Sequence, residues 1–220
     1  MSIEQNLKKI KSSLPKHVTL VAVSKTKPVS DLMEAYNAGQ RIFGENKIQE
    51  MAEKYENMPK DIEWHMIGHV QRNKVKYMAP FVSLIHGVDN FKLLKEINKE
   101  AKKNDRIIDC LFQIKIAEED SKFGMSVKES SDIIQSKTFS ELENVSITGV
   151  MGMATFTDDH NQIQKEFKQL KSTFEELKAL QTDNCKLEIV SMGMSGDYEL
   201  AIAYGSTMIR VGSSIFGSRS

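Results

Sequence analysis

The chain has 220 residues, of which 40% are hydrophobic and 27% are charged, values that are ordinary for a globular protein of one large or two small domains. Its 30 basic and 30 acidic side chains balance, which argues against nucleic-acid binding and against binding to a membrane through a polybasic patch. No stretch approaches the roughly 18 apolar residues of a membrane span, and the N-terminus lacks the apolar segment of a signal peptide. We therefore expect a cytoplasmic protein whose partners include neither nucleic acid nor membrane.

The leading segment has Ile3, Leu7, Ile10 and Leu14 at helical spacing, which predicts an amphipathic helix. After it, short β-branched runs alternate with helical segments. The predicted strands are 18–24, 41–44, 62–67, 82–86, 107–116, 145–151, 187–191 and 208–212. The helices between them are predicted at 28–39, 47–55, 71–78, 91–103, 127–136, 161–180 and 198–204.

Strict alternation of strand and helix predicts a parallel sheet with right-handed crossovers. Eight such units close into a barrel, and an open doubly wound sheet is the alternative. No linker of Gly, Ser or Pro divides the chain, so we expect one domain over residues 1–220. The predicted fold is therefore α/β, a single (β/α)8 TIM barrel with an extra N-terminal helix.

The two cysteines, Cys110 and Cys185, stand in no pattern typical of a disulfide framework or a zinc site, which favours a reducing compartment. Cys110 lies within the fifth predicted strand and should be buried as a small apolar residue. His65 and His69 are four residues apart, as helical metal ligands often are. They flank a strand end and Gly68, with no HExxH motif, so we expect no metal.

A barrel of this kind carries its chemistry at the C-terminal ends of the strands. Lys25 directly follows the first predicted strand, Asn46 the second, and Arg210 lies in the eighth. The loops after strands seven and eight, at 193–196 and 211–214, are rich in Gly and Ser. Backbone N–H groups and hydroxyls in such loops suit a phosphate, although Gly and Ser are also common in plain turns.

Closure of the barrel would make strand eight a neighbour of strand one, so Lys25 and Arg210 should face one pocket. A lysine at the end of an apolar strand is partly desolvated, and desolvation together with a nearby cation favours its neutral amine. A neutral amine attacks an aldehyde to form a Schiff base. A phosphate site, a lysine and a cation together indicate a phosphorylated aldehyde or ketone as ligand.

Six segments, taken in order, resemble the pyridoxal phosphate homeostasis protein family over nearly the whole chain. They are Ala22–Thr26, Phe43–Asn46, Trp64–Lys74, Lys122–Met125, Ser191–Asp197 and Ser206–Gly212. The resemblance implies the barrel of the alanine racemase N-terminal domain, with pyridoxal 5′-phosphate (PLP) held by Lys25 as a Schiff base.

The same resemblance implies roles for individual residues. Arg210 would face the pyridine nitrogen. The phosphate would be held by Ser195, Gly212 and Ser213. Asn46 would lie near the ring hydroxyl or the lysine. The expected neighbours of the ring are His65, Met192 and Met194.

PLP enzymes draw charge into a protonated ring nitrogen, and an arginine partner disfavours that proton. Racemases built on this barrel also add a β-domain with an acid/base tyrosine, whereas this chain ends at Ser220, eight residues after Gly212. We therefore expect a monomer that binds and delivers PLP in vitamin B6 homeostasis without robust catalysis, with PLP-dependent apo-enzymes as recipients. A racemase-like PLP enzyme and a cofactor-free lyase or aldolase acting through Lys25 are the alternatives.

Overall fold

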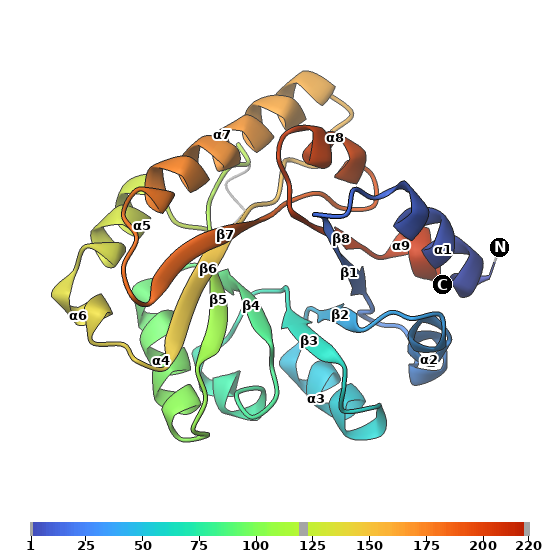
Figure 1. Cartoon of the computed structure of the whole chain (residues 1–220), viewed down its shortest axis with the longest axis horizontal. Coiled ribbons are helices and arrows are strands. Elements are labelled where there is room, and N and C mark those ends of the chain that lie inside the picture. Colours follow the sequence, from blue (N-terminus) through green and yellow to red (C-terminus); the bar gives the residue numbers. More distant parts are fainter. Residues whose placement is uncertain (1, 119–122, 218–220) are drawn as a thin grey trace.

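The fold is a closed barrel of eight parallel strands with helices outside it, seen in a computed structural model that describes residues 2–118 and 123–217 (Figure 1). Neighbouring strands pair in chain order, and β8 pairs with β1. The strands are β1 (Thr19–Val23), β2 (Ile42–Glu45), β3 (Glu63–Met66), β4 (Leu84–Val88), β5 (Ile108–Gln113), β6 (Val145–Met151), β7 (Cys185–Ser191) and β8 (Met208–Val211).

Helices lie between consecutive strands, with α1 before β1 and α9 after β8, and they cover the outside of the barrel (Figure 1). They are α1 (Ile3–Ser13), α2 (Val29–Asn37), α3 (Ile48–Asn57), η1 (Arg72–Tyr77), α4 (Phe91–Lys102), α5 (Val127–Ile134), α6 (Lys137–Ser140), α7 (His160–Lys178), α8 (Tyr198–Ala203) and α9 (Ser213–Phe216). The prediction of a (β/α)8 barrel with a leading helix is confirmed, and the open sheet is excluded because β1 pairs with β8.

Side chains alternate between two apolar layers because successive strand residues point to opposite faces. The interior of the barrel holds one buried cluster. Its members are Val21, Ile67, Leu84, Leu111, Met151 and Met208. A larger cluster fills the space between strands and helices, where Ala22, Phe43, Ile209 and Cys110 lie among many others, so the predicted burial of Cys110 is confirmed. This alternation determines which strand residues can face the inside of the barrel.

Helix α1 packs against α2 and against α9, next to the C-terminal end of the barrel chain (Figure 1). Ser2 caps it, accepting from the Gln5 N–H while the Gln5 side chain accepts from the Ser2 N–H, as in a capping box. The Asn6 side chain donates to the Ile215 carbonyl at 3.0 Å. The N-terminal helix therefore supports the turn that follows β8.

The local differences from the predicted elements have simple causes. The helix expected at 71–78 is a 3-10 helix, and the helix expected at 127–136 ends at Ile134. Ser136 begins a new helix there because its side chain accepts from the Phe139 N–H. Strand β7 starts at Cys185, earlier than predicted, and β5 ends at Gln113, three residues before the predicted end. Helix α9 was not predicted.

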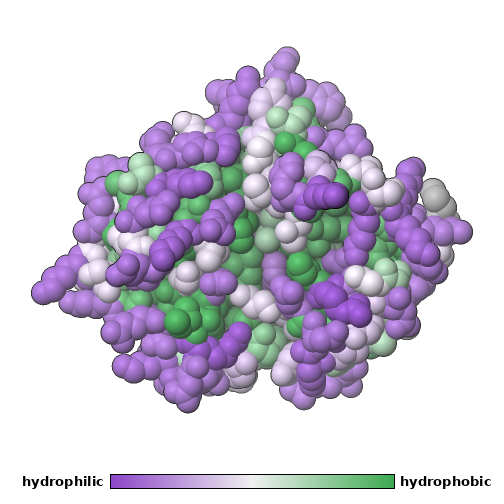
Figure 2. Space-filling model, in the orientation of Figure 1, coloured by the Kyte–Doolittle hydropathy of each residue, from purple (hydrophilic) through white to green (hydrophobic). Residues whose placement is uncertain are grey.

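The outer surface matches the balanced composition. Figure 2 shows hydrophilic side chains over much of this face, with apolar patches between them. Within the described residues, no helix combines the length and apolar character needed to cross a membrane.

Gly149 marks an irregular point in the barrel, because the register between β6 and β7 shifts between Ile147 and Gly149. A Cβ at Gly149 would lie 2.0 Å from the Ile189 carbonyl oxygen, a backbone atom that cannot swing away. The backbone of the neighbouring strand β7 therefore requires glycine at position 149.

We predict that Gly149→Ala lowers the free energy of unfolding by roughly 1–3 kcal/mol, because the added methyl forces two strands apart. Urea unfolding at neutral pH measures the change. Gly196→Ala is the matched control, since a Cβ at Gly196 meets nothing within 4 Å. Equal stability of the two variants would contradict the packing argument.

Candidate functional site

A cavity of about 790 Å³ opens at the C-terminal ends of the strands. That volume falls in the range of small-molecule sites. It receives residues from the ends of β1, β5 and β8 and from the loops after β2, β3, β6 and β7. Among the predicted site residues, those that line it are Lys25, Asn46, Met194, Ser195, Arg210, Gly212 and Ser213.

His65 and Met192 are not among the residues that line this cavity, so their place beside a bound ring stays a prediction. His65 points into the barrel on the same face as Ile67, and Ile67 lines the cavity one layer above it. Met192 follows Ser191, which faces inward, so its own side chain points outward into the cluster under the helices. Depth in the barrel separates His65 from the cavity lining, whereas strand parity turns Met192 away from it.

Lys25 continues the inward-facing series of β1, in which Val21 and Val23 pack in the barrel interior. It is half-buried and follows Ser24, which is fully buried. The next residue, Thr26, has φ of 64°, a left-handed conformation that is uncommon for a β-branched residue. The chain therefore turns sharply directly after Lys25.

The loops after β7 and β8 contact one another beside Lys25. The Gly212 N–H donates to Ser195 Oγ at 3.1 Å, and the Arg210 N–H donates to the Gly193 carbonyl at 2.9 Å. Gly193 has φ of 96°, and a Cβ there would lie 2.6 Å from the Ala201 Cβ, so only glycine permits this turn. These contacts gather Ser195, Gly212 and Ser213 on one side of the cavity.

Asn46, from the loop after β2, also lines the cavity, and its position depends on a close backbone approach. A Cβ on Gly68 would lie 2.5 Å from the Asn46 carbonyl oxygen, so the loop after β3 packs directly on the loop after β2. Gly68 therefore fixes where Asn46 meets the cavity.

Arg210 reaches the floor of the cavity from β8 while remaining 96% buried, with a relative exposure of 4%. Its guanidinium donates to Ser191 Oγ at 2.6 Å and to the Gly152 carbonyl at 3.0 Å. Burial lowers its pKa to about 10, so it stays charged near neutral pH. Two of its five N–H groups are used in these bonds, and the fork can donate to a group in the cavity.

A chain of buried polar groups continues from Arg210 into the barrel. His86 Nδ1 lies 3.1 Å from Ser191 Oγ, and His86 Nε2 lies 3.1 Å from His65 Nδ1. Burial lowers the pKa of His65 to about 3, and burial followed by the charges of His65 and Arg210 lowers that of His86 well below its usual value. Both rings are therefore neutral near pH 7, and they orient Ser191 and Arg210 without adding charge.

Several cavity residues were not predicted. His69 stacks on Phe123 with ring centroids 4.3 Å apart, and its Nδ1 lies 3.2 Å from Asp89 Oδ2. Gln113, at the end of β5, donates to the Phe123 carbonyl at 3.0 Å. Their positions at strand ends were the available signal, but polar residues at strand ends are too common to select them.

Glu166, on α7, is a further residue that the sequence did not reveal. Its carboxylate is buried and accepts from the Thr155 N–H and hydroxyl, both at 2.7 Å, and from the Glu118 N–H at 3.3 Å. It thus ties the loops after β5 and β6 to one helix. Lys122, part of a motif used above, lies outside the described residues.

The comparisons with known proteins agree with this geometry. The family model described as "Alanine racemase, N-terminal domain" matches residues 1–220. The pyridoxal phosphate homeostasis protein of Pasteurella multocida is 38% identical over 234 residues, covering 100% of this chain and 98% of the relative. The protein of the same name from Aquifex aeolicus is 37% identical over 201 residues, covering 91% of this chain and 86% of the relative.

The chain belongs to the pyridoxal phosphate homeostasis protein family. PipY of Synechococcus elongatus, in a structure with PLP bound, matches with a TM-score of 0.88 at 34% identity, covering 98% of this chain and 100% of PipY. An alanine racemase of Clostridium difficile matches with a TM-score of 0.83 at 15% identity, covering 99% of this chain and 60% of the racemase. The second likeness shows a shared fold alone.

The buried histidines make the stability of this family member depend on pH. An unfolded histidine binds a proton near pH 6.5, whereas folded His65 binds one only near pH 3. Between these values the unfolded chain binds more protons than the folded chain, so stability is present above about pH 6.5 and is lost as the pH falls.

We predict that the free energy of unfolding falls by up to about 1.4 kcal/mol per pH unit for each of these histidines as the pH is lowered from about 6.5 to about 5. His65→Asn, which keeps a neutral polar side chain, should reduce this slope. His17→Asn changes an exposed histidine and should leave the slope as in the wild type. Urea titrations at several pH values measure it, and equal slopes for His65→Asn and the wild type would refute the assignment.

Proposed function

We propose that this chain is a single-domain protein that binds PLP, carries it covalently on Lys25 as a Schiff base, and acts in intracellular PLP homeostasis. The observation that carries the proposal is the meeting of Lys25 with the loops after β7 and β8 in one cavity. The relatives named above are called PLP homeostasis proteins, and the PipY structure contains PLP. When bound, PLP supplies an aldehyde that condenses with amines and a ring that can accept electrons.

The loops after β7 and β8 suit the phosphate group. Ser195 and Ser213 offer hydroxyls, and Ser213 begins α9, where the first backbone N–H groups have no acceptor within the helix. A Cβ on Gly212 would lie 3.2 Å from the Val23 carbonyl oxygen, so glycine lets this loop approach β1 closely. Backbone N–H groups and hydroxyls are suitable donors to a phosphate dianion.

Lys25 suits the aldehyde. It lies at the end of β1, and β1 pairs with β8 so that Val21 stands beside Arg210. The neutral amine of a lysine is the nucleophile that condenses with an aldehyde. Asn46 and Met194 line the same cavity and are the candidate neighbours of the ring.

Arg210 is the residue that favours a carrier over a catalyst. In the proposed arrangement it donates to the pyridine nitrogen, and a guanidinium that remains charged near neutral pH opposes protonation of that nitrogen. The Ser191 and Gly152 contacts hold this cation in place. The site then retains the cofactor but has a weak means of stabilising a carbanion.

The remaining parts of the proposal concern the cell. Transfer to apo-enzymes that use PLP would follow from reversible attachment at Lys25, and we propose that the protein acts as a monomer in the cytoplasm. The thiols of Cys110 and Cys185 are both free and buried, as suits a reducing compartment.

A racemase-like PLP enzyme is the second candidate, because a titratable pair, His69 with Asp89, stands at the cavity. His69, which lines the cavity, lies beside the Asp89 carboxylate, and such a pair can move a proton. The exchange experiment below separates the two candidates.

We predict that Lys25→Ala abolishes covalent attachment of PLP while leaving the fold intact, because the side chain stands at the rim of the cavity and not in the core. Borohydride reduction followed by peptide mass mapping should find the cofactor on Lys25 in the wild type. Lys16→Ala changes an exposed lysine between α1 and β1 and is the matched control. An adduct of wild-type yield in Lys25→Ala would show that another lysine carries the cofactor.

We also predict that the PLP-loaded protein exchanges the α-proton of alanine in deuterated water no faster than free PLP does. The reason is that Arg210 makes the ring a poor electron acceptor. Proton NMR of D- and L-alanine, with the loaded protein or an equal concentration of PLP, measures the exchange. Rapid exchange in the wild type that is lost in His69→Ala would contradict the carrier function and support the racemase-like enzyme.

A further inference from the structure

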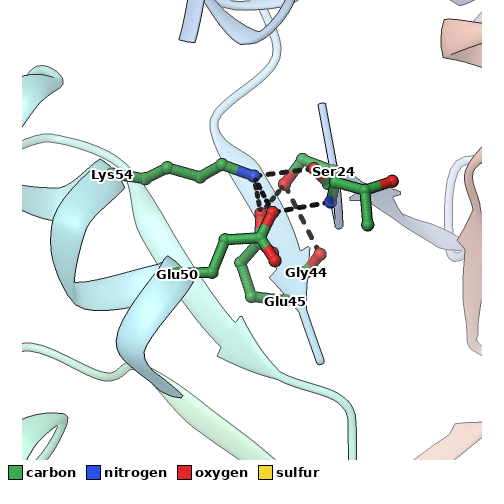
Figure 3. Close-up of polar contacts among 6 residues, drawn as sticks. Ser24, Gly44, Glu45, Glu50 and Lys54 are labelled. Carbon is green, nitrogen blue, oxygen red and sulfur yellow. Dashed lines mark hydrogen bonds and ion pairs between the residues drawn. The ribbon is translucent and has the colours of Figure 1, made fainter. Parts of the chain in front are cut away.

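A buried charged cluster lies on the outer side of the barrel, behind the segment that bears Lys25 (Figure 3). Its members are Glu45 at the end of β2 and Glu50 and Lys54 on α3. The side chains of Glu45 and Lys54 are 0% and 6% exposed, and that of Glu50 is 23% exposed. The cluster does not line the cavity, so the binding site described above leaves it unexplained.

The Lys54 ammonium makes three hydrogen bonds within and beside this cluster. Its Nζ donates to Glu45 Oε1 at 2.7 Å, to Glu50 Oε1 at 2.8 Å and to the Ser24 carbonyl at 2.8 Å. An ammonium has three N–H donors, so these contacts account for all of them. Figure 3 shows the Lys54 side chain extending from α3 toward Ser24. The lysine thus connects the helix to the peptide group that precedes Lys25.

Glu50 connects the same helix to the peptide group that follows Lys25. Its Oε1 accepts from the Thr26 N–H at 2.6 Å. Thr26 is the residue with φ of 64°, a conformation that costs free energy for a β-branched side chain and that needs a contact to hold it. Ser24 is fixed in addition by its hydroxyl, which donates to Glu45 Oε1 at 2.6 Å.

We propose that Glu45, Glu50 and Lys54 form a clamp that positions Lys25 by holding both peptide groups on either side of its Cα. Two fixed peptide groups determine the direction of the Cα–Cβ bond, and so the direction in which the amine enters the cavity. Lys54 and Glu50 are positioning residues because neither lines the cavity. This inference rests on the proposed function, in which Lys25 bears the cofactor.

Stability of the barrel does not by itself explain the cluster. A buried ion pair is weak evidence for stability, since apolar side chains of similar size often serve as well. Burial raises the pKa of Glu45 against the opposing effects of Lys54 and Ser24, and Glu45 Oε2 has no hydrogen-bond partner. Burying these charged groups therefore costs free energy. The contacts with Ser24 and Thr26 are what the cluster provides in return, because they hold the two peptide groups that flank Lys25.

Glu50 offers the cleanest test because it can be changed while the buried pair of Glu45 and Lys54 stays. Glu50→Ala removes the acceptor of the Thr26 N–H. Glu50→Gln removes the charge but keeps an oxygen that can accept from Thr26 and from Lys54. Glu53→Ala removes an exposed carboxylate from the same helix and is the matched control. Lys54→Met is avoided because it leaves Glu45 buried without its partner and can unfold the chain.

We predict that Glu50→Ala slows attachment of PLP to Lys25 by about tenfold, since a small misplacement of a reacting group is costly. Glu50→Gln and Glu53→Ala should both remain near the wild-type rate. Borohydride trapping at successive times, with mass mapping of Lys25, measures the rate. Each variant is assayed equally far below its own melting temperature. A wild-type rate in Glu50→Ala, or an equal loss in Glu50→Ala and Glu53→Ala, would overturn the proposal.

A second measurement does not depend on the cofactor. In the PLP-free protein, the Thr26 amide should exchange with deuterium roughly tenfold faster in Glu50→Ala than in the wild type or Glu50→Gln, because its acceptor is lost. Unchanged exchange would refute the clamp. If the wild type forms no adduct at Lys25, the proposed function fails, and the Thr26 exchange still decides whether Glu50 restrains this segment.

Discussion

The pairing of β1 with β8 is the constraint on which the rest of the structure depends. Four residue pairs, from Thr19 with Met208 to Ala22 with Val211, join the first strand to the last. This closure places Lys25, from the first unit, beside Arg210 and Gly212, from the last. In an open sheet the same residues would stand at opposite edges. The cavity therefore exists only once the whole chain has closed, and any ligand that bridges the two ends stabilises the closed barrel in turn.

The interior of the barrel shows how one charge can be kept near a cavity floor. Apolar side chains such as Val21 and Leu111 fill part of the interior, and His65, His86 and Ser191 fill another part beneath Arg210. Because burial keeps both histidines neutral, they supply hydrogen bonds without competing for the charge that Arg210 carries. Their neutrality links the orientation of Arg210 to pH, since protonation of either ring would place a second cation in a site that cannot solvate it.

The sequence was sufficient for the barrel because β-branched runs and helical periodicity report burial directly, and eight repeats leave few topologies. It was also sufficient to bring Lys25, Arg210 and the loops after β7 and β8 to one cavity, because the C-terminal ends of parallel strands share one face. It did not show that His65 lies one layer below the cavity lining, or that Met192, one residue after inward-facing Ser191, packs toward the helices. It failed for Glu166 and for Glu45 with Lys54 because these contacts join segments that no local pattern connects.

One group of buried polar residues lies inside the barrel wall and the other lies outside it. The histidine chain fixes a cation from inside the barrel, and the cluster of Glu45, Glu50 and Lys54 restrains the lysine segment from outside it. Supports on both sides of the barrel wall thus hold residues of the first and the last strand units in a fixed relation, as a preorganised site requires.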